Sequence, residues 1–298
     1  FARLAMMETV QFVVPAPAVA CHWQSLVPEL HDKAFNVIAH GLDFAPPRLP
    51  APPVGERLRV VVLGSLAPQK GRVLLEQLWP LLAEQVELLL IGAGEDGEAF
   101  RNRPGVTLIP RYQPDQLAAL LMDFQPEVGL LLSVWPETFS YTLSELWLLG
   151  LPVVATNLGS FADRIQDGVN GFLCEPQAEA VATRLLAIAA NRASLTPIRE
   201  RLANFQHRPV AAMVTDYHAL IPLPVCSAPR YFGTPASALS PSASPNHGRV
   251  LSIDVRAPFG EALREFGQYA GQKLAATPRL RQWQKRGAPV SILGAEET

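Results

Sequence analysis

Residues 57–195 alternate between short apolar runs and segments with helical spacing, and this alternation limits the fold more than any other feature. The apolar runs are 58–63, 86–91, 106–109, 128–132, 153–156 and 171–174, and the helical segments are 71–82, 115–124, 140–149 and 178–190. Nearly continuous apolar strands separated by helices predict a parallel sheet that is covered on both faces. We therefore expect a doubly wound α/β domain with its ligand at the carboxyl ends of the strands.

The residues on either side of this domain have a different pattern. Upstream, the order strand, helix, strand over 11–14, about 19–26 and 36–39 indicates the last piece of a preceding domain. We expect four parts: a domain remnant over 1–43, a Pro-rich linker over 44–56, the α/β domain over 57–221 with helix over 197–220, and an irregular segment rich in Pro, Ser and Ala over 222–298 that includes a last helix over 260–276. Because the sequence begins with Phe1, we expect a longer product and a missing partner domain.

The composition argues against several classes of protein. The chain has 298 residues and a net charge of −2, so nothing attracts it in bulk to nucleic acid and no nucleic-acid partner is expected. Cys21, Cys174 and Cys226 are far apart, which favours free thiols in a reducing, cytoplasmic setting. The sequence shows no signal peptide and no apolar run of roughly 18 residues, the length that a membrane-spanning helix needs.

Two carboxylates eight positions apart mark the segment that carries the chemistry. Glu137 follows a strand, whereas Glu145 falls inside a very apolar helix. Burying an unpaired carboxylate is costly, so Glu145 needs a partner, and sugar or ribose hydroxyls are suitable donors. The helix should begin near Ser140, where the free N–H groups of Ser140, Tyr141 and Thr142 favour a phosphate. One short segment can therefore hold a sugar, a pyrophosphate and a ribose.

The spacing also has a purely structural explanation, in which Glu137 caps the helix and Glu145 pairs with a basic residue in the core. The residues that follow favour a ligand-binding role for both carboxylates over this structural one. The stretch from Glu137 to Glu145, with Gly-Leu-Pro-Val-Val-Ala over 150–155, resembles the E-x7-E motif and following strand of the group 1 glycosyltransferases. The resemblance extends from about residue 40 to 176, and its wording is most similar to transferases of bacterial O-antigen and other surface polysaccharides.

Other segments resemble motifs of the same family. Residues 64–71 resemble its G-R-x-x-x-x-K-G loop, 91–94 its second glycine turn, 159–163 its G-G-x-x-E turn, 167–173 the strand entry that follows and 40–43 the end of its first domain. The resemblance gives Lys70 the role of cation for the diphosphate, but Ser65 stands at the usual Arg and Ser140 at a usual Gly. Arg111 and Tyr112 fall where the family commonly contacts the base. The alternatives are a solvated Lys70 that opens a helix and a Tyr112 that only packs.

The resemblance implies a Rossmann-like domain that forms the C-terminal, donor-binding half of a GT-B fold. It implies transfer of a hexosyl or deoxyhexosyl group from a nucleoside-diphosphate sugar to a glycan or lipid-linked glycan acceptor, with retention and without a metal or other cofactor. The expected catalytic residues are Glu137 and Lys70. The expected donor-binding residues are Gly64, Ser65, Gly92, Arg111, Tyr112, Ser140, Tyr141, Thr142 and Glu145.

Three rival functions stay open. Residues 92–97 satisfy G-x-G-x-x-G, but the pattern alone is weak, and no acidic residue ends the next strand as a nicotinamide or flavin site requires. The second rival is a non-catalytic donor-binding module of a larger polysaccharide synthase, and the third is a sugar-nucleotide epimerase. The six histidines show no metal-ligand spacing and no D-x-D occurs, which argues against a metal-dependent transferase.

The C-terminal segment has one further pattern. Phe259, Leu263, Phe266, Ala270 and Leu274 recur at helical spacing, with Trp283 and basic residues beyond them. Such a stripe suits either packing against the protein or peripheral contact with the inner face of a membrane. Glycines within the stripe weaken an isolated helix and favour packing.

Overall fold

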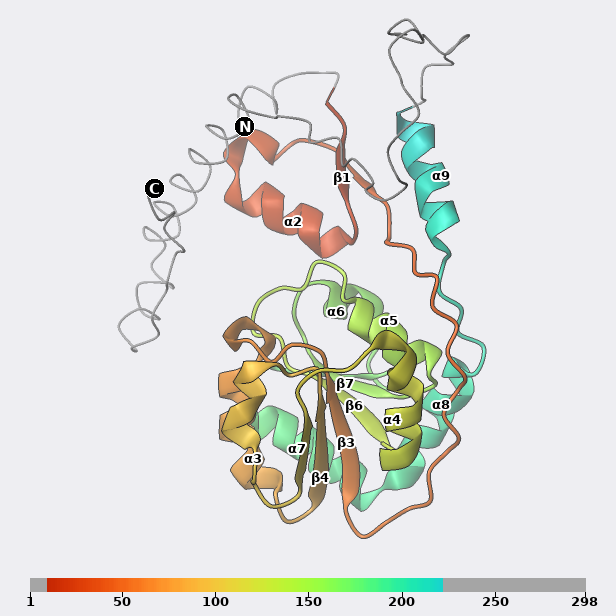
Figure 1. The fold of residues 1–298 in the computed structure, drawn as a ribbon. Helices are drawn as coiled ribbons and strands as arrows, with labels where there is room; N and C mark the ends of the chain where they lie inside the picture. The colour runs from red at the N-terminus through yellow and green to blue at the C-terminus, as the bar shows by residue number, and fades with distance from the viewer. Residues whose placement is uncertain (1–9, 222–298) are drawn as a thin grey trace, which may run out of the picture. The chain divides into compact units, whose positions relative to one another are not determined.

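The computed structural model describes residues 10–221, and its α/β domain is built on a parallel sheet (Figure 1). The strands are β3 (Leu58–Leu63), β4 (Val86–Ile91), β5 (Val106–Ile109), β6 (Val128–Leu131), β7 (Val153–Thr156) and β8 (Phe172–Cys174). They lie in the order β5-β4-β3-β6-β7-β8, and every neighbouring pair is parallel. The central strands are buried on both faces, which is why each one is apolar almost throughout.

Helices cover both faces of this sheet. The α-helices of the domain are α3 (Arg72–Leu82), α4 (Leu117–Phe124), α5 (Tyr141–Leu148), α6 (Ser160–Arg164), α7 (Ala178–Ala190) and α8 (Thr196–Leu202), and the short 3₁₀ helices are η2 (Pro68–Lys70), η3 (Glu95–Phe100), η4 (Pro114–Gln116) and η5 (Arg192–Leu195). Helices α3 and α7 pack against each other on one face, and Figure 1 shows α4 and α5 on the other. The predicted doubly wound, Rossmann-like α/β fold is confirmed.

The strand order places a switch point between β3 and β6. From β3 the chain builds outward through β4 to β5, and it then returns to pair β6 with the other side of β3. The loops that follow β3 and β6 therefore leave the sheet toward opposite faces. In open α/β sheets ligands bind at such a point, outside the carboxyl ends of the strands, and we call this region of the domain the crevice.

The residues upstream of the domain form a small parallel unit. Strand β1 (Phe12–Val14) pairs with β2 (Phe35–Val37), and α2 (Pro17–Leu26) and the 3₁₀ helix η1 (Pro28–Leu30) lie between them in the chain. The Asp163 carboxylate of α6 accepts a hydrogen bond from the Ala18 N–H at the start of α2 (2.7 Å). This contact ties the upstream unit to the carboxyl edge of the sheet.

The Pro-rich segment 44–56 contains no helix or strand, yet it is bonded to the domain. The N–H of Leu49 donates to the Leu149 carbonyl (2.9 Å), and the Arg48 guanidinium donates to the carbonyls of Leu202 and Phe205. The last described helix, α9 (Val210–Leu220), is tied at its first residue to the Asp43 carboxylate (3.0 Å). Hydrogen bonds of this kind hold the segment against the body of the domain.

Several predicted boundaries shift in the structure. The helix expected over 115–124 begins as η4 and becomes α4 only at Leu117, and the helix expected over 197–220 is interrupted at 203–209. The break precedes Pro209, which disfavours helical backbone in the residue before it. Of the cysteines, Cys21 is exposed and Cys174 buried, and neither is in a disulfide. Cys226, the helix expected over 260–276 and the stripe from Phe259 to Leu274 lie outside the described residues.

The amino edge of the sheet is closed by a buried ion pair. Glu127, just before β6, is 3% exposed and accepts from the Arg192 guanidinium (2.9 Å) and the Arg59 backbone N–H (3.1 Å). Arg199 donates to the Glu127 carbonyl (2.7 Å). Because these partners come from β3, η5 and α8, Glu127 connects the start of the sheet to the helices that follow α7.

Candidate functional site

The loops after β3, β4 and β5 meet at the carboxyl edge of the sheet. The Gly64 N–H donates to the Ile91 carbonyl (2.8 Å), and the Gly92 N–H donates to the Ile109 carbonyl (2.8 Å). The first residue of each loop is thus bonded to the last residue of the neighbouring strand, so the loops start side by side at this edge. The predicted donor-binding residues on these loops therefore share the carboxyl edge with those at the start of α5.

Lys70 and Glu137, the two predicted catalytic residues, come together across the switch point. Lys70 ends η2 in the loop after β3, and its Nζ lies 2.5 Å from the Glu137 Oε1 in the loop after β6. The Ser133 hydroxyl donates to the same carboxylate. The side chain of Lys70 is 42% exposed and that of Glu137 is 12% exposed, so the pair sits at the rim of the crevice. Lys70 is therefore not merely a solvated lysine.

Gly71 explains how the two loops approach so closely. A Cβ at Gly71 would lie 2.1 Å from the carbonyl oxygen of Leu132, and the backbone φ of +95° is one that only glycine adopts readily. The Val134 N–H also donates to the Gln69 carbonyl (3.0 Å). Backbone contact on this scale fixes the distance between the Lys70 and Glu137 loops.

Helix α5 begins at the crevice, and Ser140 is its cap. The Leu143 N–H donates to the Ser140 Oγ (3.3 Å), so the alternative in which Glu137 caps the helix is wrong. The N–H groups of Tyr141 and Thr142 belong to the first turn, where no intrahelical acceptor exists. The Thr142 hydroxyl lies 3.6 Å from where a Cβ on Gly64 would be. The helix end and the first glycine loop therefore line the same space.

The carboxylate of Glu145 has no ion pair and no hydrogen-bond donor within residues 10–221, although its backbone carbonyl accepts from the Leu149 N–H (3.0 Å). The alternative in which it pairs with a basic residue in the core is therefore wrong for the described part of the chain. Burial raises the pKa of the Glu145 carboxyl above its usual value, and burial followed by the charge of Glu145 raises the pKa of the Tyr112 phenol. The half-buried Glu145 carboxylate is therefore free to accept hydrogen bonds from a bound ligand.

Tyr112 lies against the second glycine turn. A Cβ at Gly92, whose φ is +75°, would come within 2.8 Å of the Tyr112 ring, so glycine allows the ring to approach the backbone. Tyr112 is half-buried and also packs on the core, which keeps the packing interpretation open. Arg111 and Ser65 are exposed on neighbouring loops. The structure places them at the same edge, and neither side chain makes a hydrogen bond or ion pair within residues 10–221 that defines a role for it.

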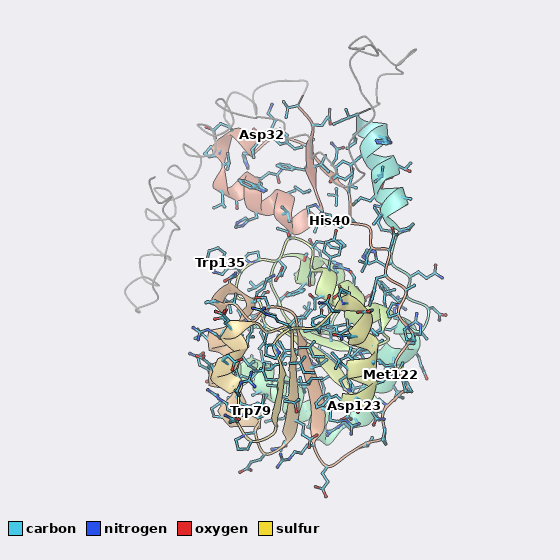
Figure 2. The ribbon with its side chains drawn as sticks, viewed as in Figure 1. Asp32, His40, Trp79, Met122, Asp123 and Trp135 are labelled. Atoms are coloured by element: carbon cyan, nitrogen blue, oxygen red, sulfur yellow. The ribbon has the colours of Figure 1, made fainter. Side chains whose placement is uncertain are left out.

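Sequence reasoning missed a cluster around Phe139. The His40 ring stacks on Phe139 (centroids 4.9 Å apart) and lies 5.4 Å from Tyr141, while the Arg164 guanidinium lies 4.2 Å from the Phe139 ring (Figure 2 labels His40). Burial, and then the charge of Arg164, lower the pKa of His40, which favours the neutral imidazole. The sequence offered a signal only for His40, which lies in a segment already matched to a family motif, whereas Arg164 lies just beyond the matched turn at 159–163.

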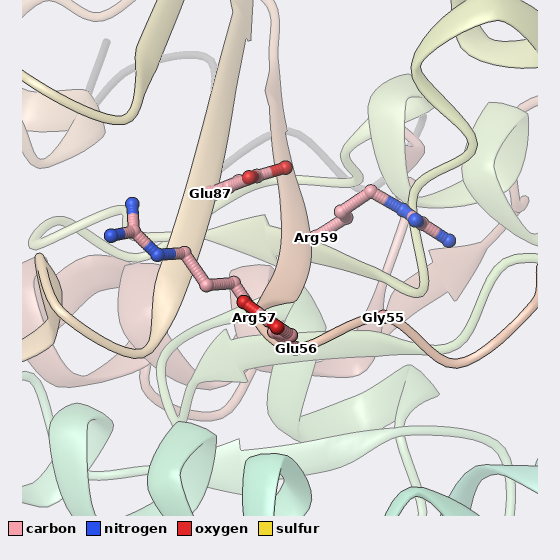
Figure 3. Close-up of a pocket in the computed structure, with 5 residues that line it drawn as sticks. All are labelled: Gly55, Glu56, Arg57, Arg59 and Glu87. Carbon is pink, nitrogen blue, oxygen red and sulfur yellow. The ribbon is translucent and has the colours of Figure 1, made fainter.

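The structure also has a hollow at the other edge of the sheet, away from the candidate site. A polar hollow of about 380 Å³ is lined by Gly55, Glu56, Arg57, Arg59 and Glu87 at the amino ends of β3 and β4, opposite the candidate site (Figure 3). Its two Arg and two Glu side chains balance in charge.

Residues 10–221 contain no group of three or more His, Cys, Asp or Glu placed to share a metal ion. None of the helices in this range is both long and apolar enough to span a membrane.

Part of the chain matches a known family model. Residues 57–191 match the family model of group 1 glycosyl transferases, and this match contains the crevice. No curated protein matches the chain. This match and the solved structures described next share the Rossmann-like α/β fold, which is one half of a GT-B fold.

Solved structures show the same fold at low sequence identity. Sucrose-phosphate synthase from Thermosynechococcus elongatus is 22% identical with a TM-score of 0.55, covering 70% of this chain and 56% of its own. Anabaena Alr3699/HepE, solved with UDP and glucose, is 19% identical with a TM-score of 0.55, covering 72% and 63%. The lipopolysaccharide outer core galactosyltransferase WaaB is 17% identical with a TM-score of 0.54, covering 70% and 61%. The chain thus spans less than two thirds of each of these proteins.

Proposed function

We propose that this chain transfers a sugar from a nucleoside-diphosphate sugar to a glycan acceptor. The observation that carries the proposal is the convergence of Lys70, Glu137, the start of α5 and the partnerless Glu145 on one crevice. A cation, a free helix end and two carboxylates together match the charges and hydroxyls of such a donor. Structural neighbours solved with UDP and glucose support this ligand class.

Each group has a separate part of the donor to bind. Lys70 and the amides of Ser140, Tyr141 and Thr142 would receive the diphosphate, and Glu145 the ribose hydroxyls. Glu137 would accept hydrogen bonds from the transferred sugar. Arg111 and Tyr112 would contact the base, and Gly64, Ser65 and Gly92 would allow the ligand to approach the backbone of the loops after β3 and β4.

The ion pair between Lys70 and Glu137 suits this chemistry. An isolated carboxylate beside a diphosphate would repel it, but the Lys70 ammonium lies against Glu137 and offsets part of the combined negative charge. During transfer an acceptor hydroxyl forms a bond to the anomeric carbon and gives up its proton to a base. The bond from that carbon to the phosphate oxygen breaks, and the nucleoside diphosphate leaves with the electron pair. Lys70 and the helix end would stabilise the charge that develops on it.

The finer features are also proposals. We propose a retaining, metal-independent reaction on a hexosyl or deoxyhexosyl donor, with an acceptor that belongs to a bacterial surface glycan and is free or lipid-linked. Structural similarity to WaaB, a galactosyltransferase of the lipopolysaccharide outer core, supports an acceptor of that kind. We further propose that the protein works in the cytoplasm or at the inner face of the membrane, together with an N-terminal GT-B domain.

A ligand screen followed by a turnover assay tests the proposal. Uridine, adenosine, guanosine and cytidine diphosphates and their glucose, galactose and mannose derivatives are screened by thermal shift, since a ligand that binds only the folded state raises its stability. Donors that bind are then incubated with bacterial glycan acceptors, and released nucleoside diphosphate and glycan mass are measured. Binding and acceptor-dependent release support transfer, whereas binding without release supports the donor-binding module. Altered sugar from donor alone indicates an epimerase, and the absence of any binding overturns the proposal.

A further inference from the structure

Arg164 makes an unusually complete set of contacts with the turn that begins α5. Its guanidinium donates to the carbonyl oxygens of Phe139 and Ser140 (2.9 Å for Ser140) and to the Ser144 hydroxyl (2.6 Å). The same group lies 4.2 Å from the centre of the Phe139 ring and 5.4 Å from that of Trp147. Arg164 therefore grips two consecutive peptides before the helix and one side chain in its first turn.

This guanidinium has no carboxylate partner within residues 10–221. Burial lowers its pKa to about 10, which still leaves it cationic at neutral pH. Arg184 makes a useful comparison, because it also lies over an aromatic ring, that of Phe172, but forms an ion pair with Asp167 (3.3 Å). Keeping a cation buried without a counter-ion is costly, so the contacts that Arg164 makes must matter to the fold or to the site.

The turn that Arg164 grips is strained. Ser140 has a backbone φ of +63°, in the left-handed region that residues with a Cβ seldom occupy. Such strain persists only where the surroundings over-determine it, and it gathers at functional sites. The carbonyl of Ser140 and the one before it are both fixed by Arg164, which leaves the turn little freedom to relax.

We infer that Arg164 is a positioning residue of the donor site, which holds the strained Ser140 turn so that the first amides of α5 face the crevice. The inference rests on the proposed function, because those amides are the ones assigned to the diphosphate. Arg164 acts through the turn and need not touch the ligand. Its unpaired charge near the helix start also adds to the positive potential there.

Calorimetry with inorganic pyrophosphate tests the inference without knowledge of the base or sugar. The variants are Arg164→Met, Arg164→Lys, the double variant Arg164→Met with Ser140→Gly, and the matched control Arg184→Met. We expect Arg164→Met to weaken pyrophosphate binding about tenfold, equivalent to 1.4 kcal/mol, and Arg184→Met to leave it within about twofold. Glycine accepts positive φ without strain, so Ser140→Gly in the Met background should recover most of the loss. Loss of packing alone would not be recovered in this way.

Lys keeps the charge but cannot bind both carbonyls and Ser144 in a fixed fork, so Arg164→Lys should also bind pyrophosphate more weakly, which keeps the test valid if the Met variant fails to fold. Wild-type affinity in both variants, or no recovery with Ser140→Gly, overturns the inference. If the parent protein binds neither pyrophosphate nor any nucleotide, the proposed function fails. The inference is then tested by hydrogen exchange, where faster exchange over 140–143 in Arg164→Lys than in Arg184→Met supports it and equal exchange overturns it.

Discussion

At the amino edge of the sheet Glu127 is 3% exposed and its carboxylate meets two donors, whereas at the carboxyl edge the half-buried Glu145 meets none within residues 10–221. The ion pairs differ in the same way. The side chains alone of Arg192 and Glu127 are 10% and 4% exposed, and those of Lys70 and Glu137 are 42% and 12% exposed. A charge with all its partners inside the protein supports the fold. A buried charge without partners, or with an exposed one, is available to a ligand.

Replacing Glu127 should give the largest effect on stability. Glu127→Gln leaves Arg192 buried without a counter-charge, and breaking a buried pair in this way costs about 3–5 kcal/mol. Urea unfolding, with the midpoint and slope compared to the parent, measures the loss. The exposed Glu179→Gln is the control and should change stability by less than about 0.5 kcal/mol. A small loss at Glu127 would show that the amino edge does not depend on this pair.

Replacing Lys70 should affect binding far more than folding. Lys70→Met removes an ion pair with an exposed partner, which contributes about 0–1 kcal/mol to stability. Binding of a nucleoside diphosphate should weaken by about 1.5–3 kcal/mol at low salt, the range for a hydrogen bond to a charged group, and its preference over the nucleoside should shrink. Calorimetry at two salt concentrations checks this. If the variant discriminates as well as the parent, the start of α5 alone holds the phosphate.

Glu145 is the direct counterpart of Glu127. Glu145→Gln should weaken nucleotide binding by about 1–3 kcal/mol, because the ribose hydroxyls lose a charged acceptor. Its unfolding free energy should stay the same or rise, since the variant removes a half-buried charge that has no partner. Opposite outcomes for the two Glu→Gln variants would support the distinction between the edges. Unchanged nucleotide affinity by calorimetry would remove Glu145 from the ribose site.

A smaller and more selective effect is expected at Glu137. Glu137→Gln should weaken binding of the nucleotide sugar by about 1 kcal/mol, a typical net value for one hydrogen bond, and leave the bare nucleoside diphosphate nearly unaffected. The two ligands are titrated against the same preparation. Equal losses for both would place Glu137 on the phosphate side of the crevice.

The regular elements of the fold could be predicted from the sequence because burial on both faces makes each strand a continuous apolar run. All six strands of the sheet fall within one residue of their predicted ends. The five-residue helix α6 is too short for a periodic pattern to reveal it. The interruption at 203–209 was missed because the apolar residues there, such as Phe205, pack on Trp147 without helical spacing.

Some residues of the candidate site could be predicted from the sequence and others could not. The sequence could nominate Lys70 and Glu137 through motifs, and the structure brings them into contact although they are 67 residues apart. Arg164 could not be predicted, because its partners Phe139 and Ser140 lie more than 20 residues away and its role depends on the φ angle of Ser140. The roles of all these residues stay predictions until ligand binding is measured.

The pH dependence of stability should give the smallest effect, and it isolates Glu145. Burial raises its pKa in the folded protein above 4.5, the ordinary value for a glutamate side chain. Below pH 4.5 both states are protonated and the group makes no difference. As the pH rises above 4.5 the unfolded chain releases its proton first, so the folded state binds more protons and stability falls until the folded pKa is passed.

Glu145→Gln lacks this loss, so its stability relative to the parent should grow as the pH rises from about 4.5 and then level off. Burial lowers the pKa values of His40 and His207, which destabilises the folded state as the pH falls below 6.5, but both proteins share that term and it cancels in the difference. Urea unfolding of the two proteins across pH 4–8 measures the difference. A difference that stays flat across this range would mean that Glu145 finds donors in the folded protein, and the contrast between the two edges would then fail.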